Sequence, residues 1–322
     1  MRFALAPNAL CSLPSLLTIR KSGTKVGYRI DTPLELTLDG DGVLNFIQER
    51  FIDTRDKTAY RGHQRASWQL KPTLRRFYER LKQANRLGSK TRKSYEGLQR
   101  ELHKKFRENV LINQDLPRDV IDKGDLWQYG QHHGLPTPLL DWTYSPYVGL
   151  FFALVDADQD DHREQIEPRC LWALNLEILD QINWTIRETI RPRLAKTLGP
   201  RILEEQIPEM QIVDNIDGYN KRLAYQRGFF TKHIFYESFE VWAKRIADEI
   251  PQESSDVPLL TKVVFEVTNE QRCLMLRALD TMNINSRVLF PDIKGSADHA
   301  RLSVEHRVPP GTKSFGWTRD RE

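Results

Sequence analysis

Apolar residues recur along this chain with two spacings, and their order predicts an α+β fold. Alternation over short runs predicts β-strands, whereas apolar positions three and four residues apart predict amphipathic helices. The predicted strands cover residues 58–62, 170–176, 228–232 and 259–267, and the predicted helices cover residues 43–52, 73–112 and 269–282. Short strands with helices inserted between them are typical of α+β proteins.

A Ser-Pro pair marks the start of one further helix. Ser145 suits the N-cap position, and Pro146 suits the first helical position, where the missing N–H of proline is not needed. The residues that follow, 147–154, are apolar on nearly every side of the helix. A helix without a polar face belongs in the protein core.

The same patterns divide the chain into three parts. Residues 1–42 are predicted to form short strands and turns that pack on the core, with a turn at the DGDG run of residues 39–42. Residues 43–308 are predicted to form the main domain, and the run 288–292 is expected to close its ordered part. Residues 309–322 are expected to form a loose tail.

The composition is that of a soluble globular protein with a sizeable core. Of 322 residues, 39% are hydrophobic and 29% are charged, and no apolar run approaches the roughly 20 residues that a membrane helix needs. Pro7, Asn8 and Pro14 interrupt the apolar N-terminal stretch, which argues against a signal peptide. The three cysteines are widely spaced, so they predict neither a disulfide framework nor a thiolate metal site. We therefore expect a cytoplasmic protein without a membrane anchor.

Charge is distributed unevenly along the chain. Residues 71–107 carry 13 Lys/Arg against three Asp/Glu, whereas residues 156–167 are strongly acidic. The basic stretch belongs to a predicted helical insertion, 71–112, with a break between two helices at Gly88-Ser89. Such a stretch can face the phosphates of a nucleic acid. The alternative is an ordinary solvated helix face.

Arg61 is the first candidate site residue, because it lies between Tyr60 and Gly62 at the end of a predicted strand. A guanidinium binds phosphate or carboxylate through two parallel hydrogen bonds. The glycine leaves the backbone open, so Gly62 can offer its own N–H and C=O to a ligand. The alternative is a structural ion pair between Arg61 and Asp141 or another acidic residue of the core.

A second candidate region, residues 128–154, concentrates polar residues among apolar ones. Its polar side chains are those of Gln131, His132, His133, Thr137, Asp141, Thr143 and Ser145. An unpaired buried polar group costs about 1–3 kcal/mol, so these residues are expected to pair with one another or to serve a site. Asp141 can anchor Arg61 or cap the turn before Ser145. The adjacent His132 and His133 face different ways on any regular element, so we expect no shared metal.

Four segments, in this order, resemble the FRG-domain family, which takes its name from a Phe/Tyr-Arg-Gly motif. They are Tyr60-Arg61-Gly62, H-x-G-L-P-T-x-L-L-D-W-T-x-S-P within residues 128–154, Q-x-G-x-F-T at residues 226–231 and L-F-P-D at residues 289–292. The resemblance covers roughly residues 42–300, and the long second motif is the specific one. Pro138 is a departure, because such motifs usually carry a basic residue there.

The order of these segments is also similar to the layout of ADP-ribosyltransferases of the Arg-Ser-Glu type. This resemblance implies a split mixed or antiparallel β core with inserted helices, and NAD as the substrate. It implies that Arg61 holds the pyrophosphate and that Gly62 binds the nicotinamide amide through its backbone. Thr143 and Ser145 would brace the site.

The resemblance assigns further residues around NAD. The stacking aromatic would be Tyr60, Trp142 or Phe230, and Thr137 and Asp141 would lie beside the cofactor.

The third catalytic position is less well defined. Gln226 stands where the motif places a Gln or Glu, although glutamine cannot act as a base. The candidate carboxylates are Glu237, Glu240 and Glu266, among which the spacing does not choose. No metal is expected. Cleavage of the nicotinamide–ribose bond builds positive charge on the sugar, and it needs orientation and electrostatic stabilisation more than a covalent nucleophile.

Resemblance to the family further implies a toxin of a phage-defence or toxin–antitoxin system, held by a neutralising partner. The basic stretch makes nucleic acid, in particular RNA, the expected acceptor. One alternative is a ribonuclease toxin, although the sequence shows no compact set of carboxylates for a metal ion. A second alternative is a non-catalytic RNA- or protein-binding module, which would leave residues 128–154 unexplained. The sequence does not indicate the acceptor atom or the oligomeric state.

Overall fold

The structure is a computed structural model, and it describes residues 29–30, 33–48, 58–87, 94–113, 116, 121, 126–155, 168–195, 208–214, 221–233, 235–249 and 257–305. Its strands are β1 (Leu34–Asp39), β2 (Thr58–His63), β3 (Leu139–Thr143), β4 (Arg169–Asn175), β5 (Gln211–Val213), β6 (Gly228–Lys232) and β7 (Leu260–Glu266). The helices before β5 are α1 (Gly40–Phe46), α2 (Thr73–Gln83), α3 (Tyr95–Asn113), α5 (Leu126–His132), α6 (Pro146–Leu154), α7 (Leu176–Thr185) and α8 (Arg191–Ala195), with a π-helical turn at Ile186–Ile190. The later helices are α10 (Lys221–Tyr225), α11 (Phe239–Ala247), α12 (Asn269–Thr281), α13 (Ser286–Leu289) and α14 (Ile293–Glu305).

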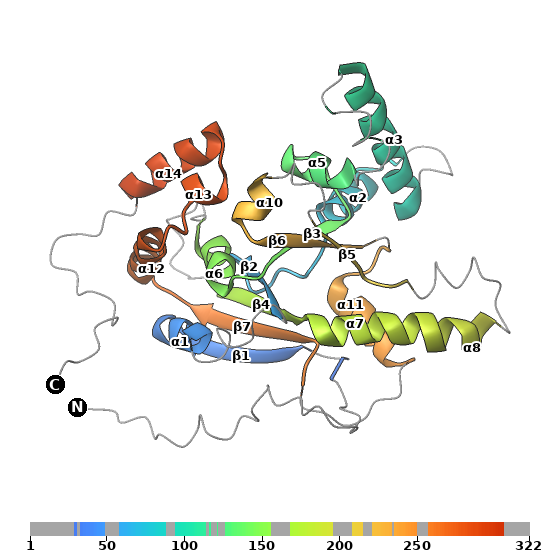
Figure 1. The fold of residues 1–322 in the computed structure, drawn as a ribbon, viewed down its shortest axis with the longest axis horizontal. Coiled ribbons are helices and arrows are strands. Elements are labelled where there is room, and N and C mark those ends of the chain that lie inside the picture. The colour runs from blue at the N-terminus through green and yellow to red at the C-terminus, as the bar shows by residue number, and fades with distance from the viewer. Residues whose placement is uncertain are drawn as a thin grey trace.

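The seven described strands form one mixed sheet in the order β1-β7-β4-β2-β3-β6-β5 (Figure 1). The pair β1–β7 is parallel and the other pairs are antiparallel. The prediction of a mixed sheet with inserted helices is therefore confirmed.

Side chains of successive strand residues point to opposite faces of the sheet, and each face has its own core. In β4, Trp172 and Leu174 belong to one core, which α7 and α11 cover, whereas Leu171 and Ala173 belong to the other, which α1, α6 and α12 cover. Helices α2, α3 and α5 add smaller apolar clusters above one end of the sheet (Figure 1).

Several predicted elements are confirmed. Helix α6 begins as expected, because Ser145 accepts a hydrogen bond from the backbone N–H of Val148 and Pro146 is the first helical residue. Helix α12 begins with a capping box made by Thr268 and Gln271. The predicted break between α2 and α3, at Gly88-Ser89, lies outside the described residues, as do the acidic run, residues 1–28 and the tail. The domain boundaries stay predictions.

Two predictions are wrong. The DGDG run is not a turn, because Asp39 caps α1 by accepting a hydrogen bond from Gly42 N, and the helix begins at Gly40. The ordered part does not close at residues 288–292, since α14 follows. Only Gly295 and Leu302 of α14 are buried, so this helix lacks the apolar stripe that would have revealed it.

Among the helices that the structure describes, none combines the length and the apolar character that crossing a bilayer requires.

Candidate active site

The sheet opens between its two central strands. β2 and β3 pair at a single position, Tyr60 with Thr143. If the antiparallel pairing continued, Gly62 would face Asp141, but a cavity of about 410 Å³ lies there instead. Its volume falls in the roughly 300–1,000 Å³ range of small-molecule sites. The lining residues come from β2, β3, β6, α2, α5, α6 and α10 and from residues 64, 134–136 and 226.

The direction of the backbone N–H and C=O of Asp141 explains why the side chain of Arg61 enters the gap. Tyr144 N donates to Arg227 O at 3.0 Å, which fixes the residues of β3 that bond to β6. Because bonded and non-bonded pairs alternate along an antiparallel ladder, the N–H and C=O of Asp141 face β2 rather than β6. With β2 displaced, the carbonyl oxygen of Asp141 accepts a hydrogen bond of 2.8 Å from Nη1 of Arg61.

The guanidinium of Arg61 is held on two of its nitrogens. Nη1 also lies 3.3 Å from Oδ2 of Asp141, and Nε donates to Nε2 of His63 at 3.1 Å. Among the described residues, no hydrogen bond reaches Nη2. The structural ion pair and the ligand-binding role that the sequence left open are therefore compatible, because Nη2 remains available to a ligand.

His63 holds this position as a neutral ring. Since Nε2 accepts from Arg61, the proton of the ring lies on Nδ1, which is 3.3 Å from the carbonyl oxygen of Trp68. Burial, with the adjacent Arg61 guanidinium, lowers the pKa of His63 to about 3. The sequence analysis did not single out His63, and only its place two residues after Arg61 in β2 could have indicated it.

The Asp141 carboxylate is fixed from its other side. Gln131 Nε2 donates to Oδ1 at 2.7 Å, and Oε1 of Gln131 accepts from the hydroxyl of Thr137. Thr137 is fully buried, and its backbone N–H donates to Thr73 Oγ1 at 2.9 Å. Thr137, an expected cofactor residue, thus lies behind the cavity and positions Asp141 through Gln131.

The Thr143 hydroxyl and Ser145 make hydrogen bonds with the backbone of neighbouring elements. The Thr143 hydroxyl donates to the backbone oxygen of Gln226 at 2.6 Å and accepts from Ser145 N at 3.1 Å. Ser145 is occupied as the N-cap of α6 and does not line the cavity. Gln226 does line it, but its side-chain amide donates to Leu289 O at 3.0 Å. These three residues therefore hold β3, β6, α6 and α13 together.

The expected stacking aromatics are buried residues at the wall of the cavity. Tyr60, Trp142 and Phe230 are at most 2% exposed and belong to apolar clusters, although parts of each line the cavity. Trp142 also donates its ring N–H to Thr231 Oγ1 at 2.9 Å. The stacking role of these residues stays a prediction, and Phe152 of α6 is a further lining aromatic, which is half-buried.

Gly62 is required by packing as well as by the gap. A Cβ at this position would lie 2.0 Å from Gly149 O and 2.5 Å from Ala153 N, so α6 rests directly on the strand. Its backbone groups face the gap by the alternation described above, since Gly62 would be the partner of Asp141. The expected backbone contact with a ligand stays a prediction.

The three candidate carboxylates do not line the cavity. Glu237 pairs with Arg245 at 2.9 Å, and Oε1 of Glu240 accepts from Leu70 N at 2.9 Å. Glu266 is exposed at the end of β7. Sequence spacing had made these residues candidates, but the sheet places them elsewhere. The carboxylate at the cavity is instead that of β3.

Two further guanidinium groups and a histidine lie around the Asp141 carboxylate. Arg222 of α10 and His132 of α5 line the cavity. Burial lowers the pKa of both, although Asp292 acts in the opposite direction on each and Asp141 does so on Arg222. Arg76, exposed on α2, has its pKa lowered by burial of part of its side chain and by Arg61, and raised by Asp141. No sequence motif pointed to Arg222 or Arg76. Among the described residues, no three His, Cys, Asp or Glu side chains gather as they would around a metal ion.

Comparison with known families gives one match. Residues 56–162 match the model of the FRG domain. A search of curated proteins and a search of solved structures each returned no match. The matched residues include β2, β3 and α6, which form the gap, whereas Arg222, Gln226 and the L-F-P-D segment lie outside the match. The chain therefore carries an FRG domain at residues 56–162.

Proposed function

We propose that the cavity binds NAD and that the protein transfers ADP-ribose from it. The observation that carries the proposal is the fixed pair of Arg61 and Asp141 at the gap between β2 and β3. A guanidinium with one free nitrogen can donate to a phosphate, and a carboxylate beside it can stabilise positive charge that develops on a sugar. The same cavity thus offers both charges that NAD cleavage requires.

The lining residues fit the chemical groups of NAD. The free Nη2 of Arg61 suits a phosphate oxygen, and Phe152 offers an apolar surface for a planar ring. The backbone N–H and C=O of Gly62 suit the carboxamide of nicotinamide, which both donates and accepts. The Asp141 carboxylate accepts from hydroxyl groups, such as those of the nicotinamide ribose.

The reaction breaks the bond between C1′ of the ribose and the nicotinamide nitrogen. The electron pair of that bond leaves with nicotinamide, and the acceptor forms a new bond to C1′ while releasing its proton to solvent. Asp141 faces the cationic sugar. Because its oxygens are engaged by Gln131 and Arg61, we assign it an orienting and electrostatic role rather than that of a base.

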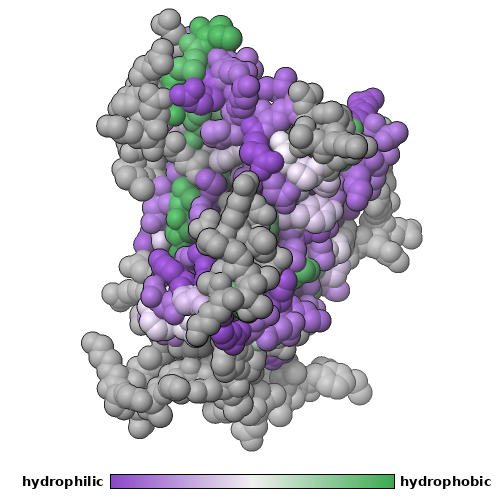
Figure 2. Space-filling view, turned by 90° about the vertical axis from the view of Figure 1, so that its right-hand side faces the viewer, coloured by the Kyte–Doolittle hydropathy of each residue, from purple (hydrophilic) through white to green (hydrophobic). Residues whose placement is uncertain are grey.

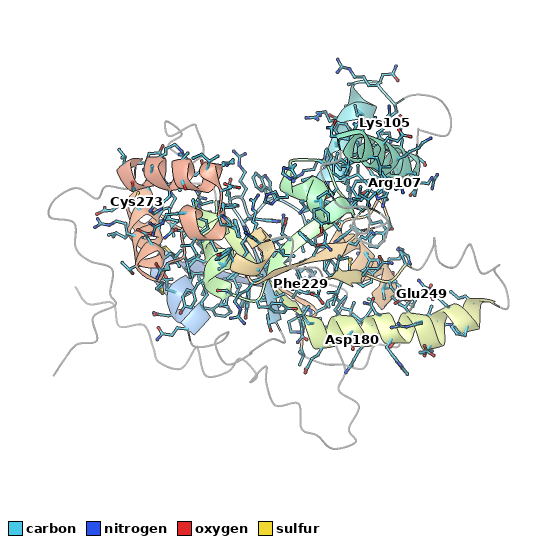
Figure 3. The ribbon with its side chains drawn as sticks, turned by 45° about the horizontal axis from the view of Figure 1, so that its top comes forward. Lys105, Arg107, Asp180, Phe229, Glu249 and Cys273 are labelled. Atoms are coloured by element: carbon cyan, nitrogen blue, oxygen red, sulfur yellow. The ribbon has the colours of Figure 1, made fainter. Side chains whose placement is uncertain are left out.

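We further propose RNA as the acceptor, approaching over α2 and α3. Part of the basic stretch is neutralised, since Glu79 lies 3.0 Å from Arg75 and 3.6 Å from Lys71. Lys105 remains exposed on α3, the helix that stands clear of the sheet (Figure 3). The side of the molecule on which α3 lies is mainly hydrophilic (Figure 2). Such a surface suits a phosphate backbone.

A toxin role with a neutralising protein partner belongs to the same proposal. Expression of the wild-type chain is expected to stop growth of a bacterial host, and expression of Arg61→Ala is expected to permit it. Growth that stops equally with both chains would separate toxicity from the cavity.

The experiment that tests the proposal uses the full chain with NAD labelled in the adenylate part. We expect release of nicotinamide and transfer of label to RNA, with at least about a 100-fold loss in Arg61→Ala and in Asp141→Asn. Arg193→Ala is the matched control, because this arginine pairs with Glu249 on the surface and has the same charge. Full nicotinamide release by a folded Arg61→Ala variant would contradict the proposal.

A second candidate, a metal-independent ribonuclease, is favoured by His132. Its Nδ1 is buried without a hydrogen-bond partner, and its lowered pKa favours the neutral ring that a general base needs. In that case His132→Ala abolishes cleavage of RNA, and NAD is not consumed. Transfer of labelled ADP-ribose to intact RNA decides for the transferase.

A further inference from the structure

Two segments that lie far apart in the sequence, and both outside the FRG match, meet at the cavity. Arg222 and Gln226 are four residues apart at α10, so they lie on the same side of this helical turn. Their partners, Phe290 and Leu289, are adjacent at the end of α13. The Q-x-G-x-F-T and L-F-P-D segments are therefore physically joined.

The Gln226 contact makes this junction rigid. Gln226 is 8% exposed, its amide donates to Leu289 O at 3.0 Å, and its backbone oxygen accepts from Thr143 Oγ1 at 2.6 Å. A buried residue with both contacts satisfied ties α13 to β3. Phe290 consequently has a fixed position relative to the strand that carries Asp141.

The guanidinium of Arg222 lies over the face of the Phe290 ring. The Cζ atom of Arg222 lies 3.9 Å from the ring centroid, which is a cation–π contact. Stacking uses the face of the guanidinium and leaves its N–H groups free in the plane. Among the described residues, none accepts a hydrogen bond from the guanidinium of Arg222, although Asp141 and Asp292 act on it electrostatically.

Two guanidinium groups therefore approach the same carboxylate from different elements. Arg61 reaches Asp141 from β2 and has Nη2 free, and Arg222 reaches the same cavity from α10. Asp141 and Asp292 are the carboxylates that act on these cations, and Arg76 adds a third guanidinium group, so three cations stand against two carboxylates. The groups around the cavity therefore carry one positive charge in excess, with donors at two separate places.

We propose that Arg222, stacked on Phe290, is a second phosphate-binding residue and that the site selects a nucleoside diphosphate over a monophosphate. This inference rests on the proposed function for the identity of the site. It adds that Arg61 and Arg222 each bind one phosphate group. Loss of Arg222 then removes the contact with only one of the two.

Titration of the full chain with ADP and with AMP tests this proposal. For wild type we expect ADP to bind at least about tenfold more tightly than AMP, as one additional charge-assisted contact implies. Arg222→Ala should lower ADP affinity at least tenfold and change AMP affinity by less than threefold. Arg61→Ala should weaken both nucleotides. Arg193→Ala, with the same change of charge at the surface, should alter neither.

Two further variants separate the phosphate contact from a structural effect. Arg222→Lys keeps the charge but loses the planar fork and should retain part of the preference for ADP. Phe290→Leu keeps the apolar volume but removes the aromatic face, and should lower ADP affinity without changing AMP affinity. An equal loss of ADP and AMP affinity in Arg222→Ala, or unchanged ADP affinity, would overturn the proposal.

Measurements with NAD distinguish failure of this proposal from failure of the proposed reaction. If Arg222 controls the preference for ADP while NAD is neither bound nor cleaved, the second phosphate contact holds and the proposed reaction fails. If NAD is cleaved while Arg222→Ala binds ADP as wild type does, the reaction holds and the second contact fails.

Discussion

Gly62→Ala tests the close contact between β2 and α6. The added Cβ would lie 2.0 Å from Gly149 O, whereas real Cβ contacts are essentially never below 3.0 Å, so the helix must retreat by about 1 Å. Overpacking of a well-packed core costs about 1–3 kcal/mol. Here the obstacles are backbone atoms of a buried helix, which cannot rotate away as a side chain can. We therefore expect the free energy of unfolding to fall by about 3 kcal/mol, the upper end of that range.

Guanidinium denaturation followed by tryptophan fluorescence measures this change. Gly134→Ala is the matched control, because Gly134 has φ +82° and no atom lies within 4 Å of an added Cβ. In the control, the free energy of unfolding should fall only by the cost of placing a residue with a side chain in the left-handed backbone region, about 1–2 kcal/mol. A Gly62→Ala chain that is no less stable than Gly134→Ala would show that α6 does not rest on β2 as described.

Two other measurements address charge. Burial, together with Arg61, lowers the pKa of His63 and of His233 to about 3, so both are neutral in the folded protein, whereas the unfolded chain protonates them near 6.5. The contribution of the two neutral histidines to the free energy of unfolding is therefore fully present above pH 6.5. It falls between pH 6.5 and 3, by up to about 2.7 kcal/mol per pH unit for the two groups. Urea unfolding midpoints that stay constant from pH 7 to 5 would contradict this. Changing Lys104, Lys105 and Arg107 to Glu should weaken binding to single-stranded RNA and reduce the salt dependence of that binding. An unchanged slope of log K against log salt would show that α3 is an ordinary solvated helix and does not bind RNA.

Local chemistry made part of the fold predictable. The start of α6 follows from Ser145 and Pro146, because N-capping and the missing proline N–H act within one turn. β4 and β7 were predictable as short, mainly apolar runs, because both faces of these strands are buried. Helix α14 gave no such signal, since most of its residues are exposed and only two are buried.

The candidate site was predictable in its location but less so in its roles. Residues 60–62 and 128–154 do meet, and Arg61 and Asp141 do pair. The cation at Arg222 could not be predicted, because its position depends on a contact with Phe290 in a distant segment. The hydrogen bond from the Gln226 amide to Leu289 O was not predictable either, because the two residues lie far apart in the sequence, and the catalytic role of Gln226 stays a prediction.

The strand order also bears on how the protein is made. β2 and β3 share one pairing position, and β2 obtains its extended partner only in β4, beyond the FRG match. β4 in turn pairs with β7, and β7 with β1, where Lys262 and Glu35 meet across 227 residues. Contacts of such separation form late and slow the folding of a nascent chain. The lining of the cavity itself spans residues 60–230, so the cavity is complete only after the chain through β6 has left the ribosome.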